Sequence, residues 1–326
     1  MFDMKYNLQL FAEMNTQTTL LNGDGNNLSP EMKTFYSDYL IDNAVPKLVH
    51  DQFGQKHPIP KNGGKQIEFR KYSPLGKMLN PLTEGVTPDG QSLNVSTVTA
   101  EVKQYGGYIT LSDVLLLTAI DNNLVQATKL LGQQAGATLD TITRNVLHEG
   151  TNIMYAGGGE GREAAGKLTV DDIKRAVRAL KAQNAERIGD SFVAIIHPDV
   201  SYDLTSDPAW QNVKDYDPKD WYEGEIGRIH GVRFVETTEA KIVTAGDAGT
   251  AIYSTLVLGD NAYGVTEIEG GGLEHFVKQL GSAGTADPIN QRATVGWKAT
   301  KTAEILVDQF MVRIESIGSF DDIQLN

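Results

Sequence analysis

The sequence predicts an α+β protein that carries a long, projecting β-hairpin. Residues 65–72 and 93–111 alternate between polar and apolar side chains, and apolar residues recur every three or four positions from Leu117 to Val146. After residue 150, short apolar stretches are mixed with helical patterns. Alternation is typical of half-buried strands, and a three-to-four-residue repeat is typical of an amphipathic helix. The chain therefore combines two strand-rich parts with one long helix between them.

Length and composition narrow the class of protein. At a usual size of about 150 residues per domain, the 326 residues form about two domains. The formal charge of −13 argues against a protein whose whole surface binds nucleic acid. The absence of cysteine excludes disulfides, thiolate metal sites and cysteine nucleophiles. The longest apolar runs, 114–117 and 192–196, are far too short to cross a bilayer, so no membrane partner is expected.

The hairpin prediction depends on the segment between the two alternating stretches. Residues 73–92 contain three prolines and three glycines, and so long a connection is hard to place inside a compact domain. An isolated two-stranded hairpin is marginally stable in water, so we expect it to lie on a partner. A mobile surface loop is the alternative. Residues 1–46 include a polar Gly/Asn-rich stretch and too little apolar surface for a core, which predicts an arm.

The later elements are predicted from periodicity and capping signals. A helix is expected over about 121–150, in which Gly132 and Gly136 suggest close approach of a neighbouring backbone; a bent helix in an ordinary core is the alternative. Thr169 to Asp172 form a capping box that predicts the start of another helix, and His197-Pro198 predicts a third. Strands are expected at 152–156, 192–196, 233–237, 255–258, 265–268, 275–278, 293–298 and, as one long strand, 304–315.

The sequence contains only incomplete matches to catalytic, nucleotide-binding and metal-binding motifs. Gly161–Lys167 fits the pattern of a phosphate-binding loop, but Leu168 stands where such a loop needs Ser or Thr for magnesium. The six histidines lack the spacing of a zinc site, and no G-x-S-x-G elbow is present. The acidic residues between 215 and 225 lack the spacing of a calcium loop, and the nearby tryptophans, Trp210 and Trp221, are expected to be packing anchors. No catalytic, cofactor-binding or metal-binding residue is predicted.

Charge is unevenly distributed along the chain. Residues 47–111 carry eight Lys and Arg against five acids, whereas residues 151–326 carry 17 against 27. A cationic hairpin on an acidic body is self-complementary head to tail, which is how heterologous interfaces close rings. The candidates for contact between subunits are Lys65, Arg70, Lys71 and Lys77.

The order of these parts resembles that of the major capsid proteins of tailed bacteriophages with the Hong Kong 97-type fold. The sequence is most similar to the capsid family typified by coliphage N-four. Three segments carry the similarity: 138–151, Val257–Val265 and, most specifically, 278–298 with its run DPINQRATVGWK. The similarity extends over about residues 30–318.

This resemblance implies a domain order. It consists of an N-terminal arm (1–46), an extended loop formed by the hairpin (47–111), a spine helix with the peripheral domain (112–164), an axial domain (165–275) and C-terminal strands returning to the peripheral domain (276–326).

The resemblance also implies a function without catalysis. Subunits would form the hexamers and pentamers of an icosahedral head that encloses double-stranded DNA without sequence-specific binding. Assembly is expected in the bacterial cytoplasm, and the protein is expected in the virion. The implied partners are a portal and a separate scaffolding protein, with a decoration protein as a further candidate. The alternatives are an encapsulin-type bacterial nanocompartment and, more distantly, a P-loop nucleotide-binding enzyme.

Overall fold

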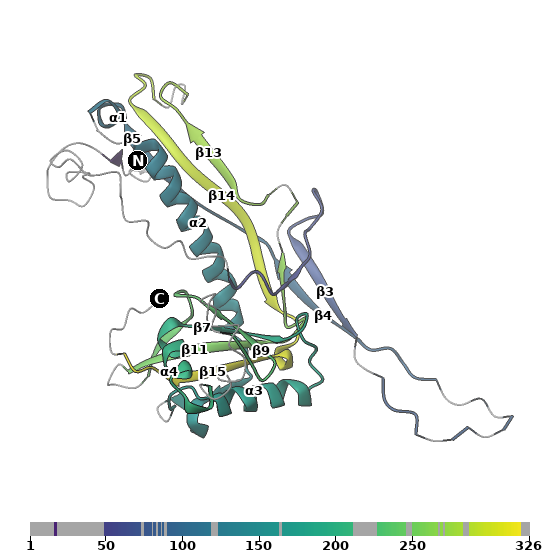
Figure 1. Cartoon of the computed structure of the whole chain (residues 1–326). Coiled ribbons are helices and arrows are strands. Elements are labelled where there is room, and N and C mark those ends of the chain that lie inside the picture. Colours follow the sequence, from purple (N-terminus) through teal and green to yellow (C-terminus); the bar gives the residue numbers. More distant parts are fainter. Residues whose placement is uncertain are drawn as a thin grey trace, which may run out of the picture. The chain divides into compact units, whose positions relative to one another are not determined.

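The computed structural model shown in Figure 1 describes residues 16–17, 49–72, 75–79, 81–82, 84–85, 87, 90–118, 123–162, 165–210, 227–245, 250–266, 268–269, 271–282 and 287–320. The chain divides into two units. The first comprises Met1–Val45, Gln104–Gly136 and Leu273–Ala299, and the second Pro46–Lys103, Ala137–Gly272 and Thr300–Asn326. Most of the expected N-terminal arm and the whole acidic cluster at 215–225 lie outside the described residues.

The first unit contains three neighbouring strands and helical segments. They are β5 (Lys103–Ser112), β13 (Glu274–Lys278), the first part of β14 (Arg292–Ile305), α1 (Asp113–Thr118) and the first half of α2 (Asn123–Leu147). Strands β13 and β14 are antiparallel, and β14 lies next to β5. The short β1 (Thr16–Gln17) pairs in parallel with β5. The Trp297 indole N–H donates to Oε1 of Gln134 at 3.2 Å, which fixes the sheet to α2.

The second unit is built on a seven-stranded mixed sheet. Its order is β6-β15-β11-β7-β9-β8, with β10 paired to β11. The strands are β6 (Ile153–Tyr155), β7 (Phe192–Ile196), β8 (Arg228–Ile229), β9 (Val232–Glu236), β10 (Ile242–Ala245), β11 (Thr250–Leu258) and β15 (Met311–Ile317). All five residues of β7 are buried, as expected for an apolar strand covered on both faces.

Two clusters of apolar side chains cover the faces of this sheet. One cluster joins the sheet to α3 (Val170–Ala182) and α4 (Pro198–Thr205), through residues such as Leu180 and Leu204. The other contains Val49, Leu147 and Tyr263 with the opposite face of the strands. Trp210 is 3% exposed and its ring packs edge-to-face on Phe234, so its prediction as a packing anchor is confirmed.

Four further strands complete the second unit. They are β2 (Gln55–Lys56), β3 (Gln66–Tyr72), β4 (Val95–Glu101) and β12 (Tyr263–Thr266). Strand β12 pairs antiparallel with the end of β14 and parallel with β2. The alternating stretch predicted at 93–111 is divided at Val102, and its first half, β4, is the part that pairs with β3.

Local sequence signals place the helix starts correctly. The Thr169 hydroxyl accepts a hydrogen bond from the Asp172 backbone N–H, and the Asp172 carboxylate accepts from the Thr169 backbone N–H, which completes the predicted capping box. The His197 imidazole caps α4, whose first residue is Pro198. Among the described helices, none has the length and hydropathy needed to span a bilayer.

Two predictions about local structure are wrong. Residues 304–315 are not one strand, because β14 ends at Ile305 and a 3-10 turn (Asp308–Phe310) precedes β15. The Asp308 carboxylate accepts the Thr151 backbone N–H at 3.0 Å, which holds the turn, while the alternating pattern continues through it unchanged. A Cβ atom added to Gly132 or Gly136 would meet no atom within 4 Å in the described part of the subunit, so the predicted close approach of a neighbouring backbone is not found among the described residues.

Candidate assembly interface

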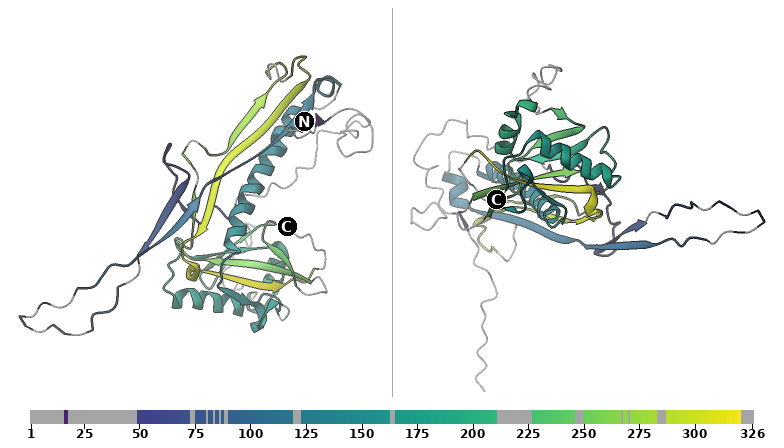
Figure 2. Two further views of the ribbon diagram at one scale, coloured as in Figure 1. Left: turned by 180° about the vertical axis from the view of Figure 1, so that it is seen from behind. Right: turned by 90° about the horizontal axis from the view of Figure 1, so that it is seen from below.

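Most residues of the β3–β4 hairpin, which belongs to the second unit, are exposed to solvent. Its strands pair antiparallel from Gln66 with Glu101 to Tyr72 with Val95. The described residues between them extend beyond the strands and are all exposed (Figure 2). Leu79 is 83% exposed and Leu82 is 75% exposed. The other large apolar side chains exposed on this segment are Leu75, Met78 and Leu93. We call residues 75–94 the hairpin loop.

The inner end of the hairpin is fixed to the rest of its unit. Ala100 is fully buried, and the Val102 backbone N–H donates to the Lys65 carbonyl at 2.8 Å. The Phe69 ring lies over Gly264 in β12, where an added Cβ would come within 2.9 Å of its Cζ atom. A larger residue at position 264 would force the Phe69 ring to move. The strands are held in place, whereas the hairpin loop has no such support in the described structure.

The four predicted contact residues are all exposed but do not form one cluster. Nη2 of Arg70 lies 3.6 Å from Oε2 of Glu68, and both side chains are largely in solvent. Lys71 follows Arg70 directly and so points to the opposite face of the strand, while Lys77 lies in the hairpin loop. Among the described residues, Lys65, Lys71 and Lys77 have no ion-pair partner. Because exposed pairs are worth only about 0–1 kcal/mol, these cations contribute little to the stability of their own subunit.

Sequence reasoning missed the apolar character of the hairpin loop. Its leucines are separated by proline and glycine, so they follow neither a strand nor a helix period. The signal was their number: apolar residues this frequent are unusual in a loop that serves only as a connection.

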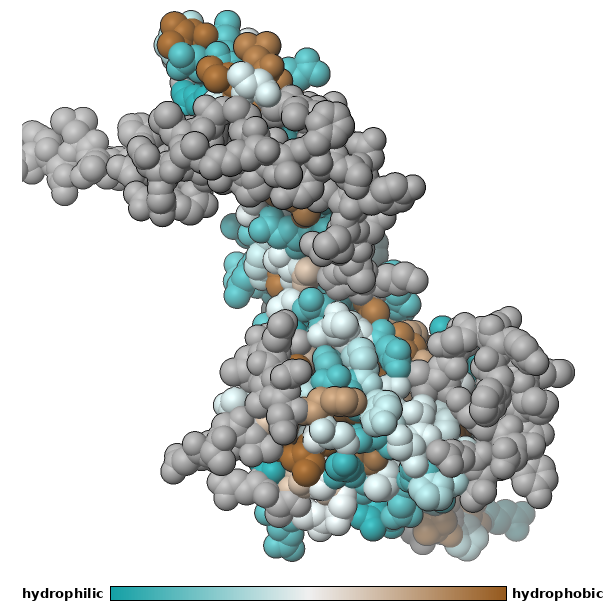
Figure 3. Space-filling model, turned by 60° about the vertical axis from the view of Figure 1, so that its left-hand side comes forward, coloured by the Kyte–Doolittle hydropathy of each residue, from teal (hydrophilic) through white to brown (hydrophobic). Residues whose placement is uncertain are grey.

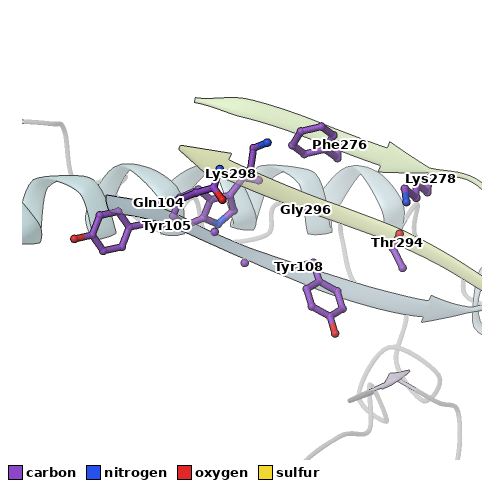
Figure 4. Close-up of a pocket in the computed structure, with 11 residues that line it drawn as sticks. Gln104, Tyr105, Tyr108, Phe276, Lys278, Thr294, Gly296 and Lys298 are labelled. Carbon is purple, nitrogen blue, oxygen red and sulfur yellow. The ribbon is translucent and has the colours of Figure 1, made fainter. Parts of the chain in front are cut away.

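The first unit has a second open surface on its strands β5, β13 and β14. A pocket of about 590 Å³ there is lined by Tyr105, Tyr108 and Phe276 together with Lys278 and Lys298. Figure 4 shows the two tyrosines on β5 and Phe276 on β13. Nζ of Lys298 lies 5.3 Å from the Phe276 ring centroid and 3.5 Å from the Glu274 carboxylate, so this cation already has partners.

Apolar side chains are also exposed around α1. Leu117 is 82% exposed and Val114 and Ile289 are at least half exposed. Figure 3 shows hydrophobic residues among hydrophilic ones at the exposed end of the first unit. Clusters of this kind mark contact surfaces more often than single exposed residues do.

A buried polar network fixes the chain where it enters the hairpin. Nδ1 of His50 lies 2.7 Å from the Asp140 carboxylate, and its backbone N–H donates to the same group at 2.8 Å. Next to it, the Asp51 carboxylate accepts hydrogen bonds from the Lys301 ammonium and from the Thr143 hydroxyl. Burial raises the pKa of Tyr263, whose hydroxyl donates to the His50 carbonyl. This network links α2, β12 and β14 to the segment that precedes the hairpin.

A second network lies in the seven-stranded sheet. The Glu315 carboxylate is 1% exposed and accepts two hydrogen bonds from Arg162, at 2.6 and 2.8 Å, while Nε of Arg313 lies 3.4 Å away. Nearby, burial lowers the pKa of His148 from 6.5 to about 3, and its Nδ1 lies 2.8 Å from the Arg144 carbonyl. The Glu315 carboxylate is therefore paired inside the subunit, whereas Nε of Arg313 and Nε2 of His148 are buried without a hydrogen-bond partner among the described residues.

The described residues of the Gly161–Lys167 segment are not arranged as a phosphate site. Nζ of Lys167 lies 2.6 Å from the Ser319 hydroxyl and 3.8 Å from the Asp203 carboxylate. The N-terminus of α3, where a phosphate would bind, already receives the Asp172 carboxylate, and the Val170 backbone N–H donates to Asp207 at 2.9 Å. Within the described ranges, no group of three His, Asp or Glu side chains is arranged to hold a metal ion.

The fold is that of solved phage capsid structures. The capsid of Ralstonia phage GP4 matches with a TM-score of 0.67 at 14% identity, covering 94% of this chain and 100% of that one. The capsid of cyanophage P-SCSP1u matches with a TM-score of 0.65 at 13% identity, covering 92% and 97%. Cyanophage Pam1 gives 0.65 at 15% identity, covering 91% and 100%. The α+β fold class predicted from the sequence is therefore confirmed.

The sequence leads to the same class independently. A model of the phage capsid protein family matches residues 95–314. The chain therefore belongs to the phage capsid protein family, and its function is that of a major capsid protein of a phage head. No curated protein sequence matches the chain.

Proposed function

We propose that this capsid protein assembles through its β3–β4 hairpin into the hexamers and pentamers of an icosahedral head that encloses double-stranded DNA. The supporting observation is the hairpin loop, which exposes Leu79 and Leu82 almost completely and carries Lys77 without a partner in the described structure. A neighbouring copy that covers this loop would remove these leucines from water.

The two kinds of side chain have different roles in this proposal. Full burial of a leucine contributes about 1.5–3 kcal/mol, whereas an exposed ion pair contributes about 0–1 kcal/mol. The leucines therefore supply most of the affinity between subunits. Lys65, Arg70, Lys71 and Lys77 favour the approach and orientation of an acidic neighbour. Because the hairpin and the surface that receives it differ, the interface is heterologous and closes rings.

Several finer assignments belong to the same proposal. The domain order is an arm at 1–46, an extended loop at 47–111, a spine helix and peripheral domain at 112–164, an axial domain at 165–275 and returning strands at 276–326. The similarity to the coliphage N-four family supports a shell without enzymatic activity that uses a portal and a separate scaffolding protein. A decoration protein is a further candidate partner. Assembly takes place in the host cytoplasm, and the shell remains in the virion.

The double variant Leu79→Ser with Leu82→Ser tests this assembly. We expect thermal unfolding of the free subunit to be unchanged and the yield of closed particles in sedimentation and electron microscopy to fall at least tenfold. The matched control is Leu130→Ser with Tyr202→Ser, which changes two exposed apolar residues that belong to none of the surfaces described above and should leave the yield near that of the wild type. Normal assembly of the hairpin variant would contradict the proposal.

The contents of the particles decide between a phage head and a nanocompartment. Particles that form during phage infection should contain DNA that resists added nuclease. A defined protein cargo in place of DNA would instead support the encapsulin-type alternative.

A further inference from the structure

Helix α3 carries a cationic face on a chain whose formal charge is −13. Lys174, Arg178 and Lys181 are exposed and follow one another at four- and three-residue spacing, so they lie on one side of the helix. The apolar stripe of α3, which includes Ile173 and Leu180, is buried against the seven-stranded sheet. The helix is therefore fixed on the sheet, and the three cations share one solvent-facing side.

A histidine completes this face from a different element. His230 lies in the tight turn between β8 and β9, with a φ of 51° followed by a φ of 79° at Gly231. It lines a pocket of about 510 Å³ together with the three cations of α3 and two small apolar residues, Val177 and Ala182. Burial and, to a smaller extent, the charge of Lys174 lower the pKa of His230.

The acids of α3 do not neutralise this face. Asp171 and Asp172 lie in its first turn, where Nε of Arg175 is 3.0 Å from Asp171 and Nη1 of Arg175 is 3.7 Å from Asp172. Among the described residues, Lys174, Arg178 and Lys181 have no ion-pair partner. Like charges four residues apart destabilise a helix. An anion bound from outside would relieve this repulsion.

The composition of the face indicates the kind of anion. Protein–protein interfaces are enriched in aromatic residues and depleted in lysine, whereas interfaces with DNA are polar and strongly positive. This face has three cations, a histidine and no aromatic anchor other than that ring. From Lys174 to Lys181 the helix rises about 10 Å, a distance over which one DNA strand presents about three phosphates.

We propose that this face of α3, formed by Lys174, Arg178, Lys181 and His230, binds backbone phosphates of the packaged duplex without reading its sequence. The inference rests on the proposed enclosure of DNA and assigns α3 to the surface that meets the genome. The contact is local, since the chain as a whole is acidic, and each subunit binds weakly while the closed shell repeats the contact many times.

Binding of the full-length protein to a labelled 30-base-pair duplex tests this assignment by fluorescence anisotropy between 50 and 200 mM salt. The variant Lys174→Ala, Arg178→Ala, Lys181→Ala should lower the affinity at least tenfold at 50 mM salt. The salt dependence should also weaken, because each lost phosphate contact reduces the slope of log K against log salt by about 0.9. The control Lys56→Ala, Lys61→Ala, Lys103→Ala removes the same charge from other exposed positions and should stay near the wild type.

Three results would overturn the assignment. Equal losses in both triple variants would show that only net charge matters, and unchanged binding in the α3 variant would show that the face does not contact DNA. Tighter binding of polyglutamate than of duplex with equal charge would identify an acidic protein segment as the partner. Particle formation by the same variants is measured separately, so that failure of DNA binding is distinguished from failure of assembly.

Discussion

The seven-stranded sheet and the β3–β4 hairpin belong to the same unit but differ in their charged side chains, which are buried and paired in the sheet and exposed on the hairpin. In the sheet, the buried Glu315 carboxylate accepts two hydrogen bonds from Arg162 and lies next to Arg313. On the hairpin, the Arg70–Glu68 pair is 3.6 Å apart and largely exposed, and Lys71 has no ion-pair partner in the described structure. Charges paired inside the subunit stabilise its fold, whereas the exposed charges are available to another molecule.

The largest effect on the free subunit should come from Glu315→Gln. The change removes the negative charge of the Glu315 carboxylate, which lies next to the guanidinium of Arg313. The Arg313 side chain is only 7% exposed. Loss of one partner of a buried ion pair costs about 3–5 kcal/mol. We expect the free energy of unfolding, measured with urea, to fall by about that amount.

Glu68→Gln is the matched control, because it makes the same chemical change on the hairpin. Its pair with Arg70 is exposed, so a change below about 0.5 kcal/mol is expected. If Glu315→Gln and Glu68→Gln lowered the free energy of unfolding equally, the ion pair in the sheet would contribute no more to stability than the exposed pair on the hairpin.

The pH dependence of stability should also be dominated by the buried region. The pKa of His148 is lowered to about 3 by burial, so the unfolded chain binds a proton near pH 6.5 while the folded protein does not. Stability from this group is complete above about pH 6.5 and is lost as the pH falls toward 3, by at most about 1.4 kcal/mol per pH unit.

His148→Asn isolates this contribution. The asparagine amide can still donate to the Arg144 carbonyl, which the imidazole contacts at 2.8 Å, but it does not titrate. Unfolding measured from pH 7 to pH 4 should show a flatter profile for the variant. An unchanged profile would mean that His148 is not the group responsible.

A smaller effect is expected from charge reversal on the hairpin. Arg70→Glu with Lys71→Glu should leave thermal unfolding of the subunit nearly unaltered and reduce the yield of particles several-fold at low salt, where screening is weakest. Lys56→Glu with Lys61→Glu reverses equal charge away from the hairpin strands and should assemble normally. If the hairpin variant unfolded instead, these residues would belong to the core of the unit.

The smallest effect is expected at the sequence that resembles a phosphate-binding loop. The Lys167 side chain is about half exposed, and its ammonium lies near the Ser319 hydroxyl and, at a longer distance, the Asp203 carboxylate. Lys167→Ala should change the free energy of unfolding by about 0.5 kcal/mol or less. ATP binding by the wild-type protein that this substitution abolished would revive the nucleotide-binding alternative.

Sequence reasoning succeeded where the determinants are local. The capping box at Thr169 and the His197-Pro198 helix start each depend on residues within one turn, and the structure confirms both. The capsid fold was predicted from the 278–298 segment, because this run of residues is specific to a family. Periodicity alone predicts helices and strands but does not define a fold.

Sequence reasoning failed where the determinants are distant along the chain. Asp51 and Lys301 are 250 residues apart and meet only in the folded unit. The break between β14 and β15 depends on Asp308 reaching Thr151, which no nearby residue signals. Sequence reasoning considered Arg162 only as part of a possible phosphate-binding loop, yet its guanidinium binds the buried Glu315 carboxylate, 153 residues away.

Hydrogen–deuterium exchange of the hairpin before and after assembly tests the central claim most directly. In free subunits, amides of the hairpin loop (75–94) should exchange rapidly, whereas those of β7 (Phe192–Ile196) should be protected. In closed particles the hairpin loop should become protected while β7 stays as it was. Rapid exchange of the hairpin loop in closed particles would show that no neighbouring subunit covers it and would contradict its role in assembly.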